Sequence, residues 1–487
     1  MNHKAKEQHP PFIGRKEELK LLASIGAQDS ASLLIVYGRR RVGKTELIEH
    51  AYQARNLLKF EGIEGYSQDK QQKIVMQQLA EYAKQPLLRD VRVQNWIDVF
   101  KYLHQYTQTG TWTLYFEEVQ WLANYEEDFV SELKYAWDNW FRHNPHIVVV
   151  LCGSATSFMI NKVVHSKALY NRSQHELRLK EFSLIETQQF FKKHALKDVM
   201  DAYLLVGGIP EYLNRLKKNS SIFLSLCEQS FKPNSFFSKE YERIFISNFA
   251  SNKHYKQIIQ FLSQRKFATR EEILKHLKVS SGGRISEVLQ DLELCGFIST
   301  YTPYSATNDS KLVRFCIQDA YLQFYYKFIQ PLKQEIEQGS FSEYPEKAIN
   351  DQTLQKWLGF SFERFCRRYH HQIAKLLGFS AVRYRAGVYF SRSTITGEPG
   401  FQIDLIFDRD DNVLTICEVK YLRGKVSSKI IHDVEKKLEL LPNPKNRTIE
   451  KVLICTYGAD ESLIGHHYFD RVLTLDDLFG ISSMVST

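Results

Sequence analysis

Leu33-Leu34-Ile35-Val36-Tyr37, followed at once by Gly38-Arg39-Arg40-Arg41-Val42-Gly43-Lys44-Thr45, is the stretch that decides the fold of this chain. The first five residues predict a buried strand, and a helical pattern begins at Lys44. The segment between them matches Gly-x4-Gly-Lys-Thr, in which glycines let backbone N–H groups surround phosphate oxygens at a helix N-terminus. The sequence therefore predicts a phosphate-binding loop, and the alternative is an ordinary tight turn between strand and helix.

This loop offers the groups that a bound nucleoside triphosphate needs. We expect Lys44 to neutralise the β- and γ-phosphates and Thr45 to offer its hydroxyl to Mg²⁺. The other residues expected to line the phosphates are Gly38, Arg39, Arg40, Arg41, Val42 and Gly43. ATP and Mg²⁺ are accordingly the predicted cofactors.

A second strand ends in two acids, Thr113-Leu114-Tyr115-Phe116-Glu117-Glu118. We expect Glu117 to hold Mg²⁺, directly or through water, and Glu118 to polarise the attacking water. The alternative is that both glutamates merely begin a solvated helix. Ser154 follows a third apolar run, 147–152, where it would contact the γ-phosphate or, equally, cap a helix.

The length of 487 residues and the order of patterns predict a multidomain α/β protein. Strands alternating with helices over 1–180 predict a parallel-sheet core. The predicted parts that follow are a helical lid over 181–249, a winged helix-turn-helix over 250–330, a linker over 331–350 and a compact α/β domain over 351–487.

The predicted winged helix has two interpretations. Thr269 to Leu274 begins one helix with a capping-box pattern, and Gly283 to Leu289 occupies the recognition-helix position. Arg284 suits contact with nucleic acid, whereas Glu287 and Asp291 oppose it. The domain is therefore either a DNA-binding module or a docking module that packs on the N-terminal core.

Near the C-terminus, two strands joined by a turn each contain an acid. Asp404 interrupts the apolar run 401–407, and Glu418 interrupts 413–421, with Lys420 on the same strand face as Glu418. Two acids and a lysine at one place can hold Mg²⁺ and position a hydroxide for attack on a phosphodiester. The alternative is a scaffold in which Asp404 and Glu418 pair with Lys420 or Arg385.

Several motifs together resemble the archaeal-type ATPases of the AAA+/STAND group. They are Phe12-Ile13-Gly14-Arg15, the Gly-Arg-Arg-Arg-Val-Gly-Lys-Thr loop, Cys152-Gly153-Ser154, Arg172 and Gly207-Gly208-Ile209-Pro210-Glu211-Tyr212-Leu213. The resemblance implies that Ile13, Gly14 and Arg15 border the adenine, that Arg172 reaches a γ-phosphate, and that the Gly-Gly-Ile-Pro turn belongs to the lid. The family's usual acidic pair is Asp-Glu, so Glu117 makes ATP binding a firmer expectation than fast hydrolysis.

The acids of the C-terminal part resemble the PD-(D/E)XK core of restriction-endonuclease-like domains, which many archaeal-type ATPases carry at this end. Glu363, on the helical pattern before the strands, completes the resemblance. It implies catalytic roles for Glu363, Asp404, Glu418 and Lys420. Ile403 stands where the family has a proline.

Composition narrows the location and the partners. Lysine and arginine number 65 against 56 acids, a net charge of +9 that modestly favours polyanions. Seven scattered cysteines without a Cys-x-x-Cys pair, and no long apolar stretch, predict a cytoplasmic protein that does not contact the membrane. The expected partner is nucleic acid, DNA rather than RNA, with a homo-oligomer or a protein partner also compatible.

Two functions fit these observations. In the first, ATP licenses metal-dependent cleavage of nucleic acid, because one chain combines a γ-phosphate site with a phosphodiesterase-like site. In the second, the protein is a nucleotide-controlled switch or DNA-binding regulator, and its nuclease-like domain serves only binding or scaffolding.

Overall fold

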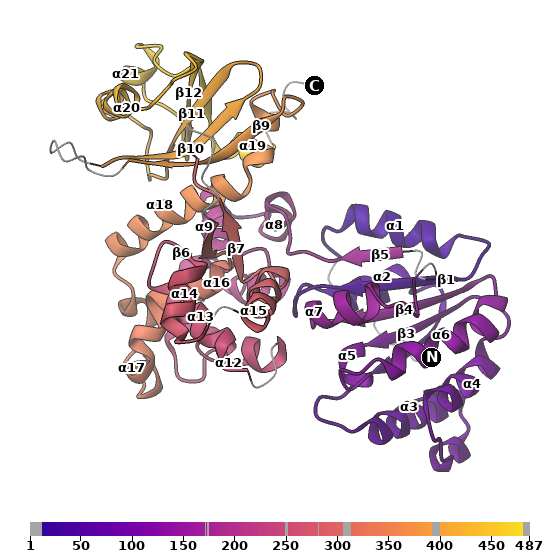
Figure 1. The fold of residues 1–487 in the computed structure, drawn as a ribbon. Helices are drawn as coiled ribbons and strands as arrows, with labels where there is room; N and C mark the ends of the chain where they lie inside the picture. The colour runs from indigo at the N-terminus through magenta and orange to yellow at the C-terminus, as the bar shows by residue number, and fades with distance from the viewer. Residues whose placement is uncertain are drawn as a thin grey trace, which may run out of the picture.

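The structure, a computed structural model, describes residues 12–170, 172, 175–248, 252–280, 282–304, 313–391 and 400–480. Three sheets organise these residues, with orders β2-β3-β4-β1-β5, β6-β8-β7 and β13-β12-β11-β10-β9. The first sheet and its helices lie on one side of the molecule, and the helical and C-terminal parts lie together on the other (Figure 1). The predicted multidomain α/β class is confirmed.

The first sheet is parallel, and helices occupy the connections between its strands. Its strands are β1 (Ser32–Tyr37), β2 (Asn56–Glu61), β3 (Trp112–Glu117), β4 (Ile147–Gly153) and β5 (His175–Arg178). Every residue of β1 and β4 is buried, as their apolar sequences require. The carboxyl ends of β1, β3 and β4 therefore lie side by side, which gathers the segments that follow them.

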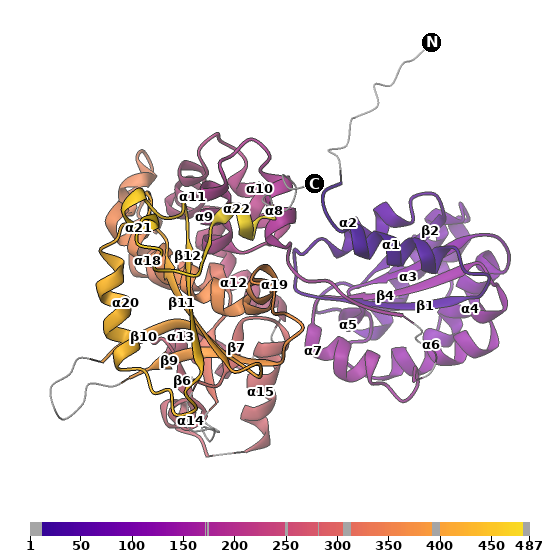
Figure 2. The same ribbon diagram turned by 90° about the horizontal axis from the view of Figure 1, so that it is seen from above.

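Helices cover both faces of this sheet (Figure 2). On β1, Leu34 and Val36 pack with α1 (Lys16–Gly26) and α2 (Lys44–Ala51). Leu33 and Ile35 pack on the opposite face. The helices of that second face are α3 (Gln68–Tyr82), α4 (Trp96–Thr107) and α6 (Asp128–Asn139), and α5 (Val119–Leu122) and α7 (Thr156–Phe158) follow β3 and β4.

Beyond β5 the chain is helical, and then it forms a small three-stranded sheet. The helices are α8 (Leu184–Phe190), α9 (Leu196–Val206), α10 (Pro210–Leu216), α11 (Ile222–Phe231) and α12 (Phe236–Asn248). The next elements are α13 (His254–Ser263), β6 (Ala268–Thr269), α14 (Arg270–Leu277), α15 (Gly283–Leu294), β7 (Ile298–Tyr301) and β8 (Arg314–Ile317). Helices followed by an antiparallel hairpin correspond to the order expected for a winged helix, and Thr269 and Glu272 form the expected capping box.

The segment expected to be a linker, 331–350, is packed instead. It follows α16 (Ala320–Phe324) and η4 (Tyr325–Ile329) and contains η5 (Gln330–Leu332), α17 (Lys333–Glu337) and η6 (Pro345–Ala348). Ile336, Pro345 and Ile349 are buried, and η6 packs on α11. Its polar sequence covers one side of the helical part, while three apolar residues anchor it.

The C-terminal part is a mixed sheet between helices. Its elements are α18 (Asp351–Arg368), α19 (His370–Leu376), β9 (Tyr384–Phe390), β10 (Gln402–Arg409), β11 (Val413–Lys420), α20 (Ile430–Glu439), β12 (Thr448–Cys455), α21 (Glu461–Ile464), β13 (Arg471–Leu473) and α22 (Leu475–Leu478). Strands β9, β10 and β11 are antiparallel, and β12 and β13 continue the sheet in parallel.

The parts share one continuous apolar core and several polar contacts. That core extends from the α1/α2 face of the first sheet through the helical part to β10 and β11. The Tyr421 hydroxyl, after β11, donates to Asp201 on α9 at 2.6 Å, and Arg368 on α18 pairs with Glu181 at 2.7 Å. In the described ranges, no helix has the length and apolar character needed to cross a membrane.

Candidate functional site

The phosphate-binding loop connects β1 to α2 and depends on its two glycines. Gly38 has φ 154°, and a Cβ there would lie 2.2 Å from the Leu179 carbonyl oxygen, so no larger residue fits. Gly43 has φ 88° immediately before α2. Lys44 lies back over the loop, and its Nζ donates to the carbonyl oxygens of Gly38 (2.9 Å) and Arg39 (3.3 Å). The buried ammonium thus stands where phosphate oxygens would enter.

Glu117 meets the loop at the carboxyl edge of the sheet. The Thr45 hydroxyl donates to Glu117 Oε1, so the two predicted Mg²⁺ ligands are adjacent. Lys59, on the neighbouring strand β2, lies 2.7 Å from Glu117 Oε2. Glu117 is buried, and so is every residue of α5, so these glutamates do not begin a solvated helix.

Glu118 is the second acid and is held by the neighbouring strand end. It has φ 51°, and its Oε2 accepts from Ser154 N (3.0 Å), Ser154 Oγ (2.7 Å) and Gln120 Nε2 (2.7 Å). Ser154 therefore anchors Glu118, and Ala155, without a side-chain cap, precedes α7. This arrangement suits a fixed carboxylate that orients water beside the loop.

The three loop arginines turn toward other parts of the chain. Arg39 pairs with Asp319, directly before α16, and stacks 4.7 Å from the Phe297 ring centroid. Burial lowers the pKa of Arg39, but the Asp319 carboxylate outweighs it and holds that pKa above the ordinary value.

The other two loop arginines also leave the loop. Arg41 pairs with the buried Glu240 of α12 at 2.9 Å, and Arg40 lies 5.8 Å from the Trp121 ring. Their predicted contact with phosphates would have to be made from these positions.

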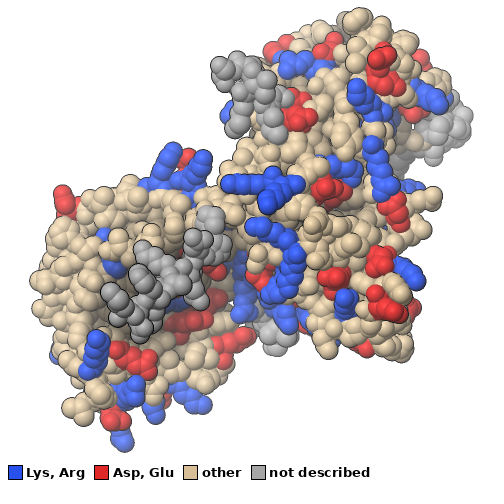
Figure 3. All heavy atoms as spheres, turned by 180° about the vertical axis from the view of Figure 1, so that it is seen from behind, with Lys and Arg blue, Asp and Glu red and all other residues tan. Residues whose placement is uncertain are grey.

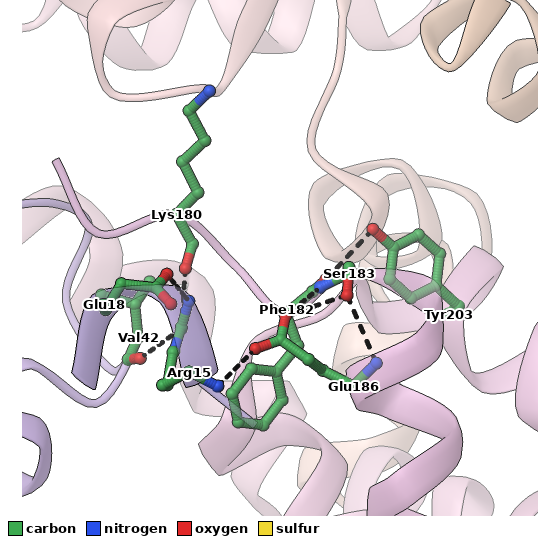
Figure 4. A network of polar contacts seen from close by, with 8 residues as sticks. All are labelled: Arg15, Glu18, Val42, Lys180, Phe182, Ser183, Glu186 and Tyr203. Carbon is green, nitrogen blue, oxygen red and sulfur yellow. Dashed lines mark hydrogen bonds and ion pairs between the residues drawn. The ribbon is translucent and has the colours of Figure 1, made fainter. Parts of the chain in front are cut away.

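Arg15 joins the loop to the first helix of the helical part (Figure 4). Arg15 Nη2 donates to the carbonyl oxygens of Val42 (2.9 Å) and Lys180 (2.7 Å), and its backbone N donates to Glu186 Oε1 (2.7 Å). Glu186 forms a capping box with Ser183 at the start of α8. Ile13, Gly14 and Arg15 therefore lie beside the end of the loop, and their contact with adenine remains a prediction.

Arg172 is the predicted site residue that the structure places elsewhere. Its Nε lies 2.8 Å from Asp138 Oδ1, and it lines a cavity of about 550 Å³ with Ser30 and Ala31. These two residues precede β1, whereas the loop follows β1, and six strand residues span about 20 Å. Because the parallel β5 must start at this amino edge, Arg172 does not reach a phosphate bound in its own chain.

A second polar cluster lies on β10 and β11 of the C-terminal sheet. Asp404 Oδ2 accepts from Val419 N at 3.2 Å, and Gln402 Nε2 bridges Asp404 Oδ1 (3.0 Å) and Glu363 Oε2 (3.2 Å). Burial, and then the nearby Glu418 carboxylate, raise the pKa of Asp404. Asp404 also lies in an irregularity of the β9–β10 pairing, between Ile403 and Ile406.

Two lysines hold the carboxylate of Glu418. Lys420 Nζ lies 2.9 Å from its Oε1, and Lys437 Nζ, from α20, lies 2.7 Å from its Oε2. Lys420 and Glu363 line a cavity of about 370 Å³ together with other residues that include the basic Lys356 and Arg423.

The pairs foreseen by the scaffold alternative are formed only in part. Lys420 pairs with Glu418, as that alternative predicted, whereas Arg385 pairs with Asp408 at 2.5 Å instead of with Asp404 or Glu418. The predicted residues Glu363, Asp404, Glu418 and Lys420 are thus brought together, and Gln402 and Lys437 join them.

The acidic side chains of the two clusters can be compared with the ligands that a metal ion requires. In the described part of the chain, no three His, Cys, Asp or Glu side chains form a ready metal-binding group. Asp404 and Glu418 are both buried, and the Glu418 carboxylate disfavours the charged form of Asp404, an effect that a divalent cation would relieve. The pair fits Mg²⁺ with water as the remaining ligands, and Thr45 with Glu117 fits a second Mg²⁺ beside the loop.

Comparison with known proteins identifies the N-terminal part. Residues 12–216 match the family described as an ATPase domain predominantly from Archaea. These residues, called the ATPase domain below, are similar to that family. Residues 325–433 match a family of archaeal and bacterial proteins of unknown function. The matched residues include the loop at 38–45, so the predicted resemblance to archaeal-type ATPases is confirmed.

Several individual proteins are similar to this chain. An uncharacterized protein of Methanocaldococcus jannaschii is 26% identical over 439 residues, 88% of this chain and 92% of its own. An uncharacterized ATP-binding protein of the same organism is 55% identical over 38 residues, 8% of this chain and 64% of its own. The solved Walker-type ATPase of Pyrococcus abyssi has TM-score 0.47 at 16% identity, covering 65% of this chain and 96% of that one.

Lys44→Ala should weaken nucleotide binding by the ATPase domain. The substitution removes the ammonium that lies over the loop, and a charge-assisted contact to phosphate is equivalent to roughly ten- to hundredfold in affinity. Titration with a fluorescent ATP analogue measures this, with Lys20→Ala on the exposed face of α1 as control. Equal affinity in the two variants would contradict the assignment.

Glu118→Gln should bind nucleotide but turn it over at least about 100-fold more slowly, because an amide cannot take a proton from water. The amide oxygen still accepts from Ser154, so the local structure should persist. Single-turnover hydrolysis measures the rate, with exposed Glu126→Gln as control. Wild-type turnover by Glu118→Gln would remove this residue from the mechanism.

Asp319→Asn should lower the free energy of unfolding by about 3 kcal/mol, because it leaves the Arg39 guanidinium buried without its counter-charge. Asparagine retains the acceptor that caps α16, where Asp319 Oδ1 accepts from Leu322 N, so only the charge is lost. Denaturant unfolding compares it with Asp351→Asn, whose exposed pair with Arg423 should contribute less than about 1 kcal/mol. Equal stability of the two variants would show that Arg39 does not depend on Asp319.

Proposed function

We propose that this protein binds and slowly hydrolyses ATP with Mg²⁺, and that nucleotide state controls Mg²⁺-dependent cleavage of nucleic acid by the C-terminal domain. The contact between Thr45 and Glu117 supports the first half, because both oxygens that a phosphate-bound Mg²⁺ needs meet beside Lys44. The similar Methanocaldococcus protein described as ATP-binding is consistent with it. In this proposal the loop supplies the positive charge that binds the phosphates. Glu117 is a ligand of Mg²⁺, and Glu118 is the carboxylate that orients the attacking water.

The coupling follows a series of packed elements. Arg39 binds Asp319, and Asp319 begins α16, which packs on α9. Helix α9 packs in turn on α18, which carries Glu363 of the C-terminal cluster. A nucleotide that draws Arg39 toward its phosphates would release Asp319, and α16 is the first element free to move.

The C-terminal cluster supports phosphodiester cleavage as the controlled reaction. Asp404 and Glu418 would hold Mg²⁺, and Lys420, which lines the cavity, would stabilise charge that develops on the phosphate. Mg²⁺, when bound there, would activate a water and polarise the phosphodiester. Figure 3 shows lysine and arginine side chains gathered where the ATPase domain meets the other parts, on a face suited to a polyanion. We expect DNA rather than RNA as the substrate.

A second candidate function is a nucleotide-controlled switch without cleavage. It is favoured by the lysines that already neutralise Glu418 and by the position of α15. In α15, Asp291 accepts from Ser157 of the ATPase domain at 2.6 Å, and Arg178 donates to the Leu294 carbonyl oxygen at 2.6 Å. These contacts support the docking interpretation of the winged helix, whereas Arg284, at the exposed start of α15, is still open to nucleic acid.

Glu418→Gln should abolish Mg²⁺-dependent cleavage of plasmid DNA and weaken Mn²⁺ binding at the C-terminal domain. The amide removes one of two carboxylates that would hold the metal, while the lysines remain. Gel assays with ATP measure cleavage by the otherwise unchanged protein, and isothermal titration of Mn²⁺ without nucleotide measures metal binding. Glu439→Gln, on the exposed end of α20, is the matched control.

If wild-type protein cleaves neither DNA nor RNA with Mg²⁺ or Mn²⁺, the switch is preferred. If it cleaves and Glu418→Gln cleaves equally well, the reaction belongs to another site.

A further inference from the structure

Lys59 lies among carboxylates at the edge of the nucleotide site. It is on β2, next to β3, and its Nζ lies 2.7 Å from Glu117 Oε2 and 3.0 Å from Glu49 Oε1 of α2. Its side chain is 24% exposed and Glu117 is 10% exposed, so the pair is largely shielded from water and salt. A contact of this kind holds its partner more firmly than a surface ion pair.

The two oxygens of Glu117 have different partners. Oε1 accepts from the Thr45 hydroxyl, while Oε2 faces the Lys59 ammonium. A glutamate has three side-chain torsions, and ordering them on metal binding would cost rotamer entropy of about 1–2 kcal/mol. The Lys59 contact fixes the far end of the side chain in advance and leaves the oxygen beside Thr45 directed at the loop.

We infer that Lys59 is a positioning residue for the metal of the nucleotide site, holding Glu117 so that its Oε1 and the Thr45 hydroxyl form one ligand pair. The inference rests on the proposed binding of Mg²⁺ and ATP at the loop. Lys59 contacts neither metal nor nucleotide in this role. Glu49 shares its charge, which reduces the repulsion between the ammonium and a divalent cation nearby.

The alternative is that Lys59 only stabilises the edge of the sheet. The two roles differ in one observable, because a stabilising ion pair changes the free energy of unfolding but not the Mg²⁺ concentration that nucleotide binding requires. Residues that orient a metal ligand typically change metal affinity by roughly 10- to 100-fold when they are lost. The Mg²⁺ dependence therefore separates the two roles.

Lys59→Met should bind a fluorescent ATP analogue in EDTA with wild-type affinity, but its half-saturating Mg²⁺ concentration should rise about tenfold. Methionine preserves most of the apolar stem and removes the charge. The half-saturating Mg²⁺ concentration of Lys59→Arg should lie between those of wild type and Lys59→Met, because its guanidinium can still reach a carboxylate oxygen. Lys20→Met, which loses an exposed pair with Glu17 on α1, should match wild type.

A second variant makes the test independent of the folding of Lys59→Met. Glu117→Asp withdraws the carboxylate from Lys59 by about one C–C bond, roughly 1.5 Å, and should raise the Mg²⁺ requirement by itself. Because Lys59 acts through Glu117, adding Lys59→Arg to Glu117→Asp should not change the Mg²⁺ requirement further. Wild-type Mg²⁺ dependence in folded Lys59→Met, or full additivity of Lys59→Arg with Glu117→Asp, would overturn the inference. Absence of nucleotide binding by wild type would instead overturn the proposed function.

Discussion

The buried ion pair between Arg39 and Asp319 is the contact on which the rest of the molecule depends. A pair of this kind adds little net stability, because both charges lose their hydration, but separating it leaves a buried charge unpaired. The phosphate-binding loop is consequently held from outside its own domain. Arg41 repeats the arrangement with Glu240 of α12. Ion pairs therefore connect the loop to α12 and to the start of α16.

Both candidate sites compensate their acids with lysines. Glu117 faces Lys59 beside the loop, and Glu418 lies between Lys420 and Lys437 in the C-terminal domain. Buried carboxylates require either a cation or a proton, and lysine supplies the cation where no metal is bound. The two sites differ in which oxygens the lysines occupy. At Glu418 both oxygens face an ammonium group, so an entering metal competes with the lysines, whereas at Glu117 Lys59 contacts Oε2 and leaves Oε1 beside Thr45.

The sequence allowed prediction of those site residues that lie close together along the chain. The loop is a local motif, and Asp404, Glu418 and Lys420 belong to one hairpin, whose register brings them together. Lys59, Lys437 and Asp319 were missed because they belong to other elements, including a strand, β2, that has no strong apolar pattern. The resemblance implied that Arg172 reaches a γ-phosphate, yet Arg172 lies with Ser30 and Ala31 at the opposite edge of the sheet from the loop. A motif does not reveal which end of a strand its neighbours approach. The packed segment 331–350 was expected to be a linker because polar residues outnumber the three apolar anchors.

Amide hydrogen exchange with and without a non-hydrolysable ATP analogue and Mg²⁺ tests the central claim most directly, because exchange reports local opening of each element. If the loop arginines transmit nucleotide state, protection should change in 319–324 and 351–368 as well as in 38–45, and the distant changes should disappear in Asp319→Asn. Changes confined to 12–216 in the wild type would contradict the account, since the nucleotide would then be bound without any effect on the C-terminal domain.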